Sequence, residues 1–144
     1  MTATVREMLR DKSEVYTVAP DATVYDALRL MADMNIGAVL VRSDQTLHGI
    51  FSERDYARKV ILLGKTSRET LVKEIMTSPV ISVEPHWTAD QCMALMTQKH
   101  VRHLPVLEEG RLVGVISIGD VVRAVVDEQK FTISSLERYM MTGG

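Results

Sequence analysis

One pattern occurs twice along this chain, and the repeat restricts the possible folds more than any other feature of the sequence. Residues 15–56 align on residues 80–121 without a gap after a shift of 65 positions. A period of this length fits two copies of one supersecondary unit better than a short-repeat solenoid. Two related halves packed face to face would form two related clefts. The matched pairs include Val18 with Val83, Pro20 with Pro85, Thr23 with Thr88, Gly49 with Gly114, Ser52 with Ser117 and Asp55 with Asp120.

Each copy is expected to fold as a strand, a helix, a hairpin and a second helix. Short apolar runs at 15–18 and 80–83 precede a proline, which is typical of a strand. The first helix of each copy opens with the spacing of a capping box, Thr23 with Asp26 and Thr88 with Gln91. Near-continuous apolar hairpins at 38–51 and 104–116 predict sheets covered by helices. The second helices are predicted from Ser52 to about Leu63 and from Ser117 past Val126.

The predicted fold class is α/β (α+β), with two pseudo-symmetric units that each pack a small sheet against helices. We expect one unit over residues 5–66, the other over 67–128, and a helical extension over 129–144. Ile133, Leu136 and Met140 form a narrow apolar stripe on that extension, which suits packing or a dimer contact.

Composition excludes several classes of protein. A chain of 144 residues with 46% hydrophobic and 25% charged residues is ordinary for a globular domain. The net charge of -2 gives no reason to expect nucleic acid or an anionic membrane as a partner. No apolar run reaches the length of a membrane span, and residues 1–7 lack the apolar core of a signal peptide, so we expect a cytoplasmic protein. The single cysteine, Cys92, lies among apolar residues of a predicted helix and is expected in the core.

The motif Gly-x-x-Ser-x-x-Asp joins each hairpin to the helix that follows. Its members are Gly49, Ser52 and Asp55, then Gly114, Ser117 and Asp120. One interpretation needs no ligand: serine and aspartate cap the helix, a device worth about 0.5–2 kcal/mol. The other is a ligand site, because both copies keep the same residue types and a helix N-terminus after a strand favours an anionic group.

These residue types suit a nucleotide. Glycine lets a flat group approach the backbone, and a carboxylate accepts hydrogen bonds from a ribose diol, each worth about 1.5–3 kcal/mol. The same carboxylate repels phosphate, so cations must hold phosphate elsewhere. Arg54 offers that charge in the first copy. In the second copy Arg102 and His103 offer it, or they form only a solvated entry to a strand.

The sequence gives no catalytic residues. It contains no HExxH motif, phosphate-binding P-loop or GxGxxG fingerprint, and Ser52 and Ser117 lack a GxSxG context. A metal site from His100 and His103 is not expected, because their spacing is poor and Cys92 is predicted to be buried.

The order Val-x-Pro-x-x-Thr, apolar helix, hairpin and Gly-x-x-Ser-x-x-Asp resembles the cystathionine β-synthase (CBS) domain. Two in tandem resemble a Bateman module, and Met76-Thr77-Ser78-Pro79-Val80 is a typical opening of its second half. The resemblance covers residues 5–128. It implies two units packed through their sheets, adenosine-containing ligands in the clefts between them, and homodimers that form through the helices.

By position, the resemblance also implies two sets of ligand-binding residues. The first set is Ile36, Gly37, Ser52, Arg54, Asp55, Thr77, Pro79 and Val80. The second set is Ser13, Val15, Tyr16, Arg102, His103, Ser117 and Asp120. The chain departs from the family pattern at Lys12-Ser13-Glu14, where the second copy has Thr77-Ser78-Pro79.

Three hypotheses for function follow. The leading one is a stand-alone regulatory module, not an enzyme, that binds AMP, ADP, ATP or NAD(H) and signals to an unknown regulated partner by a conformational shift. The second is a structural or interaction module with empty clefts, in which serine and aspartate only cap helices. The third is an enzyme that acts on a nucleotide. The sequence does not separate these nucleotides from S-adenosylmethionine.

Overall fold

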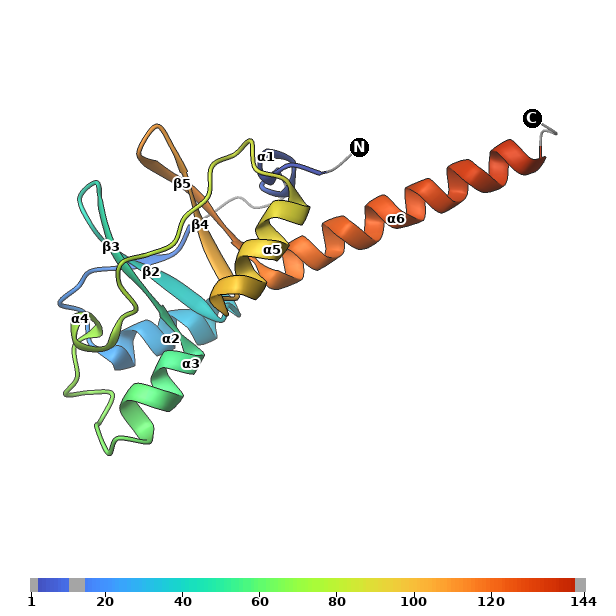
Figure 1. The fold of residues 1–144 in the computed structure, drawn as a ribbon. Helices are drawn as coiled ribbons and strands as arrows, with labels where there is room; N and C mark the ends of the chain where they lie inside the picture. Colours follow the sequence, from blue (N-terminus) through green and yellow to red (C-terminus); the bar gives the residue numbers. More distant parts are fainter. Residues whose placement is uncertain (1–2, 11–14, 142–144) are drawn as a thin grey trace. The chain divides into compact units, whose positions relative to one another are not determined.

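The computed structural model describes residues 3–10 and 15–141, and these residues form two compact units. One unit is continuous and runs from Val15 to Ile81. The other joins the N-terminal segment before Val15 to the chain from Ser82 onward. Each unit contains its own small sheet (Figure 1).

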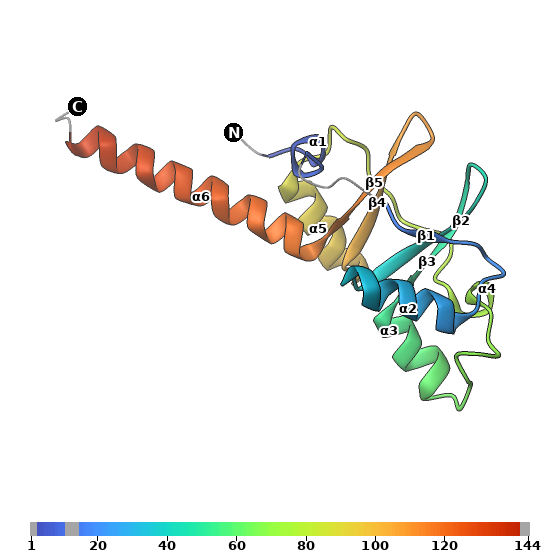
Figure 2. The same cartoon turned by 180° about the vertical axis from the view of Figure 1, so that it is seen from behind.

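The continuous unit is built on a three-stranded sheet in the order β1-β2-β3. Strand β1 runs parallel to β2, and β2 pairs antiparallel with β3. Helices α2 and α3 cover one face of this sheet (Figure 2). The elements are β1 (Thr17–Val18), α2 (Val24–Met34), β2 (Ala38–Ser43), β3 (Thr46–Ser52), α3 (Glu53–Tyr56), the π-helix η1 (Ala57–Ile61) and α4 (Val72–Ile75).

The core of this unit lies between the helices and the sheet. Apolar residues of α2 recur every three or four positions, which places them on one helix face. They pack with strand and helix residues to form one buried cluster: Val24, Ala27, Met31, Val39, Val41, Phe51, Val60, Val72 and Ile75. Thr23 caps α2 by accepting a hydrogen bond from the Asp26 backbone N–H at 3.1 Å.

The second unit contains one antiparallel hairpin, in which His103 lies opposite Ser117 and Glu108 opposite Arg111. Its elements are α1 (Val5–Met8), α5 (Ala89–Lys99), β4 (His103–Glu108), β5 (Arg111–Ser117) and α6 (Ile118–Met141). Cys92 is fully buried, as predicted, and burial raises the pKa of its thiol from 9.0 to about 11. Thr88 and Gln91 form both hydrogen bonds of the predicted capping box.

The predicted second helix and C-terminal extension of this unit form a single helix. Helix α6 has 24 residues, and its C-terminal half extends well past α5 (Figures 1 and 2). Four apolar side chains of that half are exposed: Phe131, Ile133, Leu136 and Met140. Among the described residues, no helix has both the length and the hydropathy to cross a membrane.

Short segments that lead into each sequence repeat pack against residues of the other repeat. The Val5 N–H donates to the Trp87 carbonyl at 2.8 Å, and Val72 N–H donates to the Ala22 carbonyl at 2.8 Å. Helix α1 therefore belongs to the unit with α5 and α6, and α4 belongs to the unit with α2 and α3. The compact units are offset along the chain from the two repeats.

Gly49 and Gly114 provide space for these segments. A Cβ at Gly49 would lie 2.8 Å from the Thr77 carbonyl oxygen, and one at Gly114 would lie 2.6 Å from Leu9 Cδ2. The expectation that these glycines admit a flat ligand group is therefore wrong, because the chain itself occupies the space beside them.

Two predicted elements differ in the structure. Residues 80–83 do not form a strand: within this segment only Val83 makes a bridge, to Val106. The helix predicted from Ser52 to about Leu63 changes from α-helix to π-helix at Ala57. Thr23 and Asp26 form only half of their predicted capping box among the described contacts.

Candidate functional site

Ser52 and Asp55 form a reciprocal cap where β3 runs into α3. The Ser52 N–H donates to Asp55 Oδ2 at 3.0 Å, and the Asp55 N–H donates to Ser52 Oγ at 3.2 Å. The Ser52 hydroxyl also lies 3.1 Å from Oδ2. Asp55 is among the few buried polar residues of the described chain. The predicted cap is therefore present, and it uses one carboxylate oxygen, which leaves both interpretations of the motif open.

The other oxygen of Asp55 faces two side chains from outside the cap. The Thr77 hydroxyl donates to Oδ1 at 3.0 Å, and Lys59 Nζ lies 3.2 Å from the same atom. Lys59 also donates to the Ile75 carbonyl at 3.2 Å and lies 3.4 Å from Thr77 Oγ1. An ionised carboxylate offers about four acceptor positions. Asp55 thus uses all of its hydrogen-bonding capacity within this unit.

The second copy repeats the cap with a different cation. The Ser117 N–H donates to Asp120 Oδ2 at 2.8 Å, and the Asp120 N–H donates to Ser117 Oγ at 3.2 Å. Oδ1 of Asp120 pairs with Arg123 at 3.0 Å. In both copies, then, Oδ2 completes the cap while Oδ1 turns to a cationic side chain.

All eight residues predicted for the first site belong to the continuous unit. The Gly37 carbonyl accepts a hydrogen bond from the Glu53 N–H at 3.1 Å, which holds this part of the chain beside the cap. Ile36 and Val80 are half-buried, whereas Arg54 and Pro79 are exposed. The structure brings Ser52, Asp55 and Thr77 into direct contact. The side chain of Arg54 makes no hydrogen bond or ion pair within the described part of the chain.

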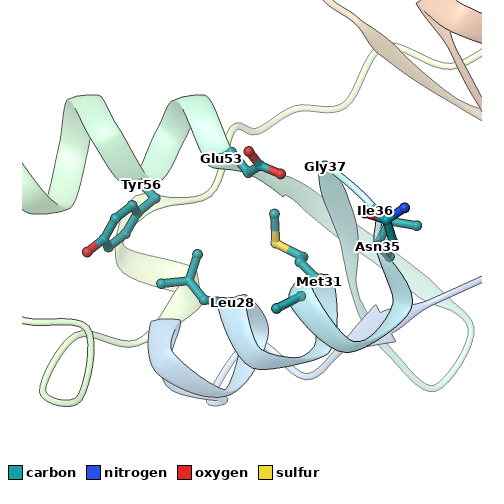
Figure 3. Close-up of a pocket in the computed structure, with 8 residues that line it drawn as sticks. Leu28, Met31, Asn35, Ile36, Gly37, Glu53 and Tyr56 are labelled. Carbon is teal, nitrogen blue, oxygen red and sulfur yellow. The ribbon is translucent and has the colours of Figure 1, made fainter.

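A groove of about 520 Å³ lies between α2 and the start of α3 (Figure 3). It shares only Ile36 and Gly37 with the predicted site, and it does not include Asp55. Its remaining lining comes from the two helices: Leu28, Met31, Ala32, Asn35, Glu53 and Tyr56. The groove is therefore a helix-face feature, separate from the capped carboxylate.

The residues predicted for the second site are divided between the units. Val15 and Tyr16 belong to the continuous unit, and Ser13 lies outside the described residues. The other four, Arg102, His103, Ser117 and Asp120, lie in the second unit. There the Arg102 carbonyl accepts a hydrogen bond from Ile118 N–H at 2.8 Å, which repeats the contact between Gly37 and Glu53.

Sequence reasoning missed Lys59. It lies four residues after Asp55, a spacing that brings side chains together on a helix, so the pair could have been found from the sequence. Its contact with the Ile75 carbonyl could not, because that contact depends on how α4 packs. The described residues hold no group of three or more His, Cys, Asp or Glu side chains placed to bind a metal ion.

Comparisons with known proteins agree with this architecture. The sequence model of the CBS domain matches residues 5–61 and again residues 72–127. The mitochondrial CBS domain-containing protein CBSX3 of Arabidopsis thaliana is 43% identical over 128 residues, which cover 85% of this chain and 62% of that protein. The chain thus spans less than two thirds of that plant relative.

Solved structures give the same result. A protein from Burkholderia ambifaria, provisionally described as a signal-transduction protein with CBS domains, is 50% identical with a TM-score of 0.85, covering 88% of this chain and 96% of that one. The CBS-domain containing protein ATU1752 from Agrobacterium tumefaciens is 41% identical with a TM-score of 0.81, covering 86% and 94%. The predicted α/β architecture is confirmed, and the chain belongs to the CBS-domain family, with two CBS domains in tandem as in a Bateman module.

Proposed function

We propose that this CBS pair is a regulatory, signal-transduction module that binds an adenine nucleotide through Asp55. One observation carries the proposal: the helix cap needs only Oδ2, yet Oδ1 is also turned toward exchangeable partners. Thr77 is exposed and Lys59 is partly exposed, so both can yield to ribose hydroxyls. A residue that served only as a cap would not need this second arrangement.

The chemistry of the surrounding residues supports a nucleotide. A ribose hydroxyl that donates to Oδ1 makes a charge-assisted hydrogen bond, worth about 1.5–3 kcal/mol. Ile36, Pro79 and Val80 offer apolar surface for the adenine base, and Gly37 adds backbone polar groups. Arg54, exposed on α3, offers positive charge for phosphate. The expected ligands are AMP, ADP, ATP or NAD(H).

A second site of the same kind is proposed around Asp120. Ser117 supplies the cap there, and Arg102 and His103 supply positive charge for phosphate.

The proposed activity is signalling by linkage and involves no chemical reaction. A ligand at 100 times its dissociation constant stabilises the conformation that it prefers by about 2.7 kcal/mol. That difference can shift binding of a regulated partner protein only as far as the ligand discriminates between the two conformations. We also propose a cytoplasmic location, which imaging of the tagged chain tests.

The groove between α2 and α3 supports a further part of the proposal, a homodimer. Met31 and Leu28 provide apolar contact there, and Glu53 provides a polar rim (Figure 3). Leu28→Glu would place a charge in this face, and light scattering would then report monomers where the unmodified chain gives dimers.

A thermal shift experiment tests nucleotide binding. Protein stripped of small molecules by unfolding and refolding is heated with AMP, ADP, ATP or NAD. We expect at least one of them to raise the melting temperature, and Asp55→Asn with Asp120→Asn to remove the shift. The asparagine oxygen still accepts the capping bond, so this pair of variants separates ligand binding from capping. A stable protein that no adenine compound affects would support a purely structural module instead.

A further inference from the structure

We propose that Lys59 makes the first site selective for phosphorylated nucleosides. In this proposal its ammonium moves from the Asp55 carboxylate to the phosphate of the ligand when ribose takes its place on Asp55. The inference rests on the proposed function of Asp55 and adds a role for a residue that the sequence motif does not contain.

The contacts of Asp55 require a displacement. Oδ2 accepts from the Ser52 N–H and lies against its hydroxyl, and Oδ1 meets Thr77 and Lys59. Because no acceptor position is left over, a ribose diol can bind this carboxylate only if one of these donors moves away.

Lys59 can move away from Asp55 at a lower cost than the residues of the cap. The Ser52 contacts form the helix cap, and losing a cap costs about 1 kcal/mol. Lys59 instead reaches Asp55 on a long flexible side chain that is 41% exposed, so water can solvate its ammonium as it leaves. Exposed ion pairs contribute about 0–1 kcal/mol, and this pair, with Lys59 exposed and Asp55 buried, belongs near the upper end of that range.

A displaced ammonium needs a new anion, and this need creates the selectivity. Adenosine would take Asp55 and leave Lys59 with only the Ile75 carbonyl and Thr77 oxygens near it. AMP brings its own anion to the same edge of the unit. Binding of AMP therefore exchanges one charge pair for another, whereas binding of adenosine only breaks one.

The second copy lacks this lysine. Ala124 occupies the position equivalent to Lys59, and Arg123 pairs with Asp120 from one residue earlier. Arg58 is the equivalent of Arg123 in the first copy, yet Asp55 pairs with Lys59. The two carboxylates thus pair with different cations, so a role that depends on Lys59 belongs to the first site alone.

NMR titration of the full chain tests the proposal at the level of single residues. The amide signals of Ser52 and Asp55 report on the first site alone, and AMP and adenosine are added separately. The variants are Lys59→Met, which keeps the length of the side chain, Lys59→Arg, which keeps its charge, and Arg58→Met. Arg58 is the neighbouring exposed cation, and its side chain makes no hydrogen bond or ion pair among the described residues, so it controls for loss of net charge.

We expect the unmodified chain and Arg58→Met to bind AMP at least about tenfold more tightly than adenosine. Lys59→Met should bind adenosine more tightly and AMP more weakly, so that the ratio of the two dissociation constants approaches one. Lys59→Arg should keep most of the preference for AMP. A ratio that Lys59→Met leaves unchanged overturns the inference alone, as does an equal loss in Arg58→Met. If neither compound moves these signals in the unmodified chain, the proposed function fails and the inference fails with it.

Discussion

The two capped carboxylates have the same local geometry and different surroundings. Asp55 and Asp120 each bond the N–H of the serine three residues earlier through Oδ2, at 3.0 and 2.8 Å. Asp55 then meets Thr77 and Lys59 through Oδ1, whereas Asp120 meets Arg123. The contacts of each aspartate with its serine are shared, and the cation that pairs with Oδ1 differs. The difference indicates that the cap maintains the fold in both units while the outer contacts are free to specialise.

The glycines at the start of each motif offer the strongest test of this comparison. An alanine Cβ at position 49 would lie 2.8 Å from the backbone oxygen of Thr77, whereas at position 114 it would meet only side-chain atoms of Leu9. We expect Gly49→Ala to lower the free energy of unfolding by about 3 kcal/mol and Gly114→Ala by about 1 kcal/mol. Urea denaturation measures both. Equal losses would contradict the view that the backbone at Thr77 cannot yield.

The second-largest difference in stability is expected between the variants of Asp55 and Asp120. Asp55→Ala removes the partner of Ser52, Thr77 and Lys59, so we expect a loss of about 2 kcal/mol, against about 1 kcal/mol for Asp120→Ala. The matched asparagine variants keep a capping oxygen and should each recover part of the loss. A larger loss for Asp120→Ala would reverse the comparison.

Cys92 should make the stability of the second unit depend on pH in a way that has no counterpart in the first unit. Its equivalent in the first copy is Ala27, and both are fully buried. Because the pKa of the folded thiol is raised from 9.0 to about 11, unfolding releases a proton between these values, and stability present below pH 9 is lost as pH rises. We expect a loss of about 1 kcal/mol by pH 10, measured by urea denaturation. Cys92→Ala should remove this dependence; if it persists unchanged, another group is responsible.

The cations should have the smallest effect on stability. Lys59 is 41% exposed and Arg123 is 69% exposed, so solvent screens both pairs. We expect Lys59→Met and Arg123→Met to change the free energy of unfolding by about 1 kcal/mol or less. A loss near that of Asp55→Ala would show that Lys59 is part of the structural cap and would weaken its proposed role in ligand preference.

Local patterns in the sequence predicted most of the fold. The hairpins, the buried Cys92 and the caps at Thr88, Ser52 and Ser117 depend on residues only a few positions apart, and all are present. Residues 80–83 failed as a strand although they matched 15–18 in sequence. Their apolar character alone does not provide the backbone partners that a strand requires.

Apart from the local pair of Asp55 and Lys59, the parts of the site that the sequence did not predict involve distant segments. The family resemblance placed Asp55 and Thr77 in the same set of residues, but the hydrogen bond between them, across 22 residues of chain, was not predicted. The role of Gly49 was misjudged for the same reason, since the atoms beside it belong to Met76 and Thr77. Spacing along a chain does not show which segment will cross which strand.

The exchanged leading segments also bear on how such a chain could have arisen. In a half-length ancestor with a single copy, the hairpin surface beside its glycine would have been uncovered, because the leading segment of each copy packs against the other copy. Two such chains could have exchanged their leading segments, as in a domain-swapped dimer, so that each segment covered the hairpin glycine of the other chain. Joining the two genes would then have fixed within one polypeptide an association that formerly depended on concentration.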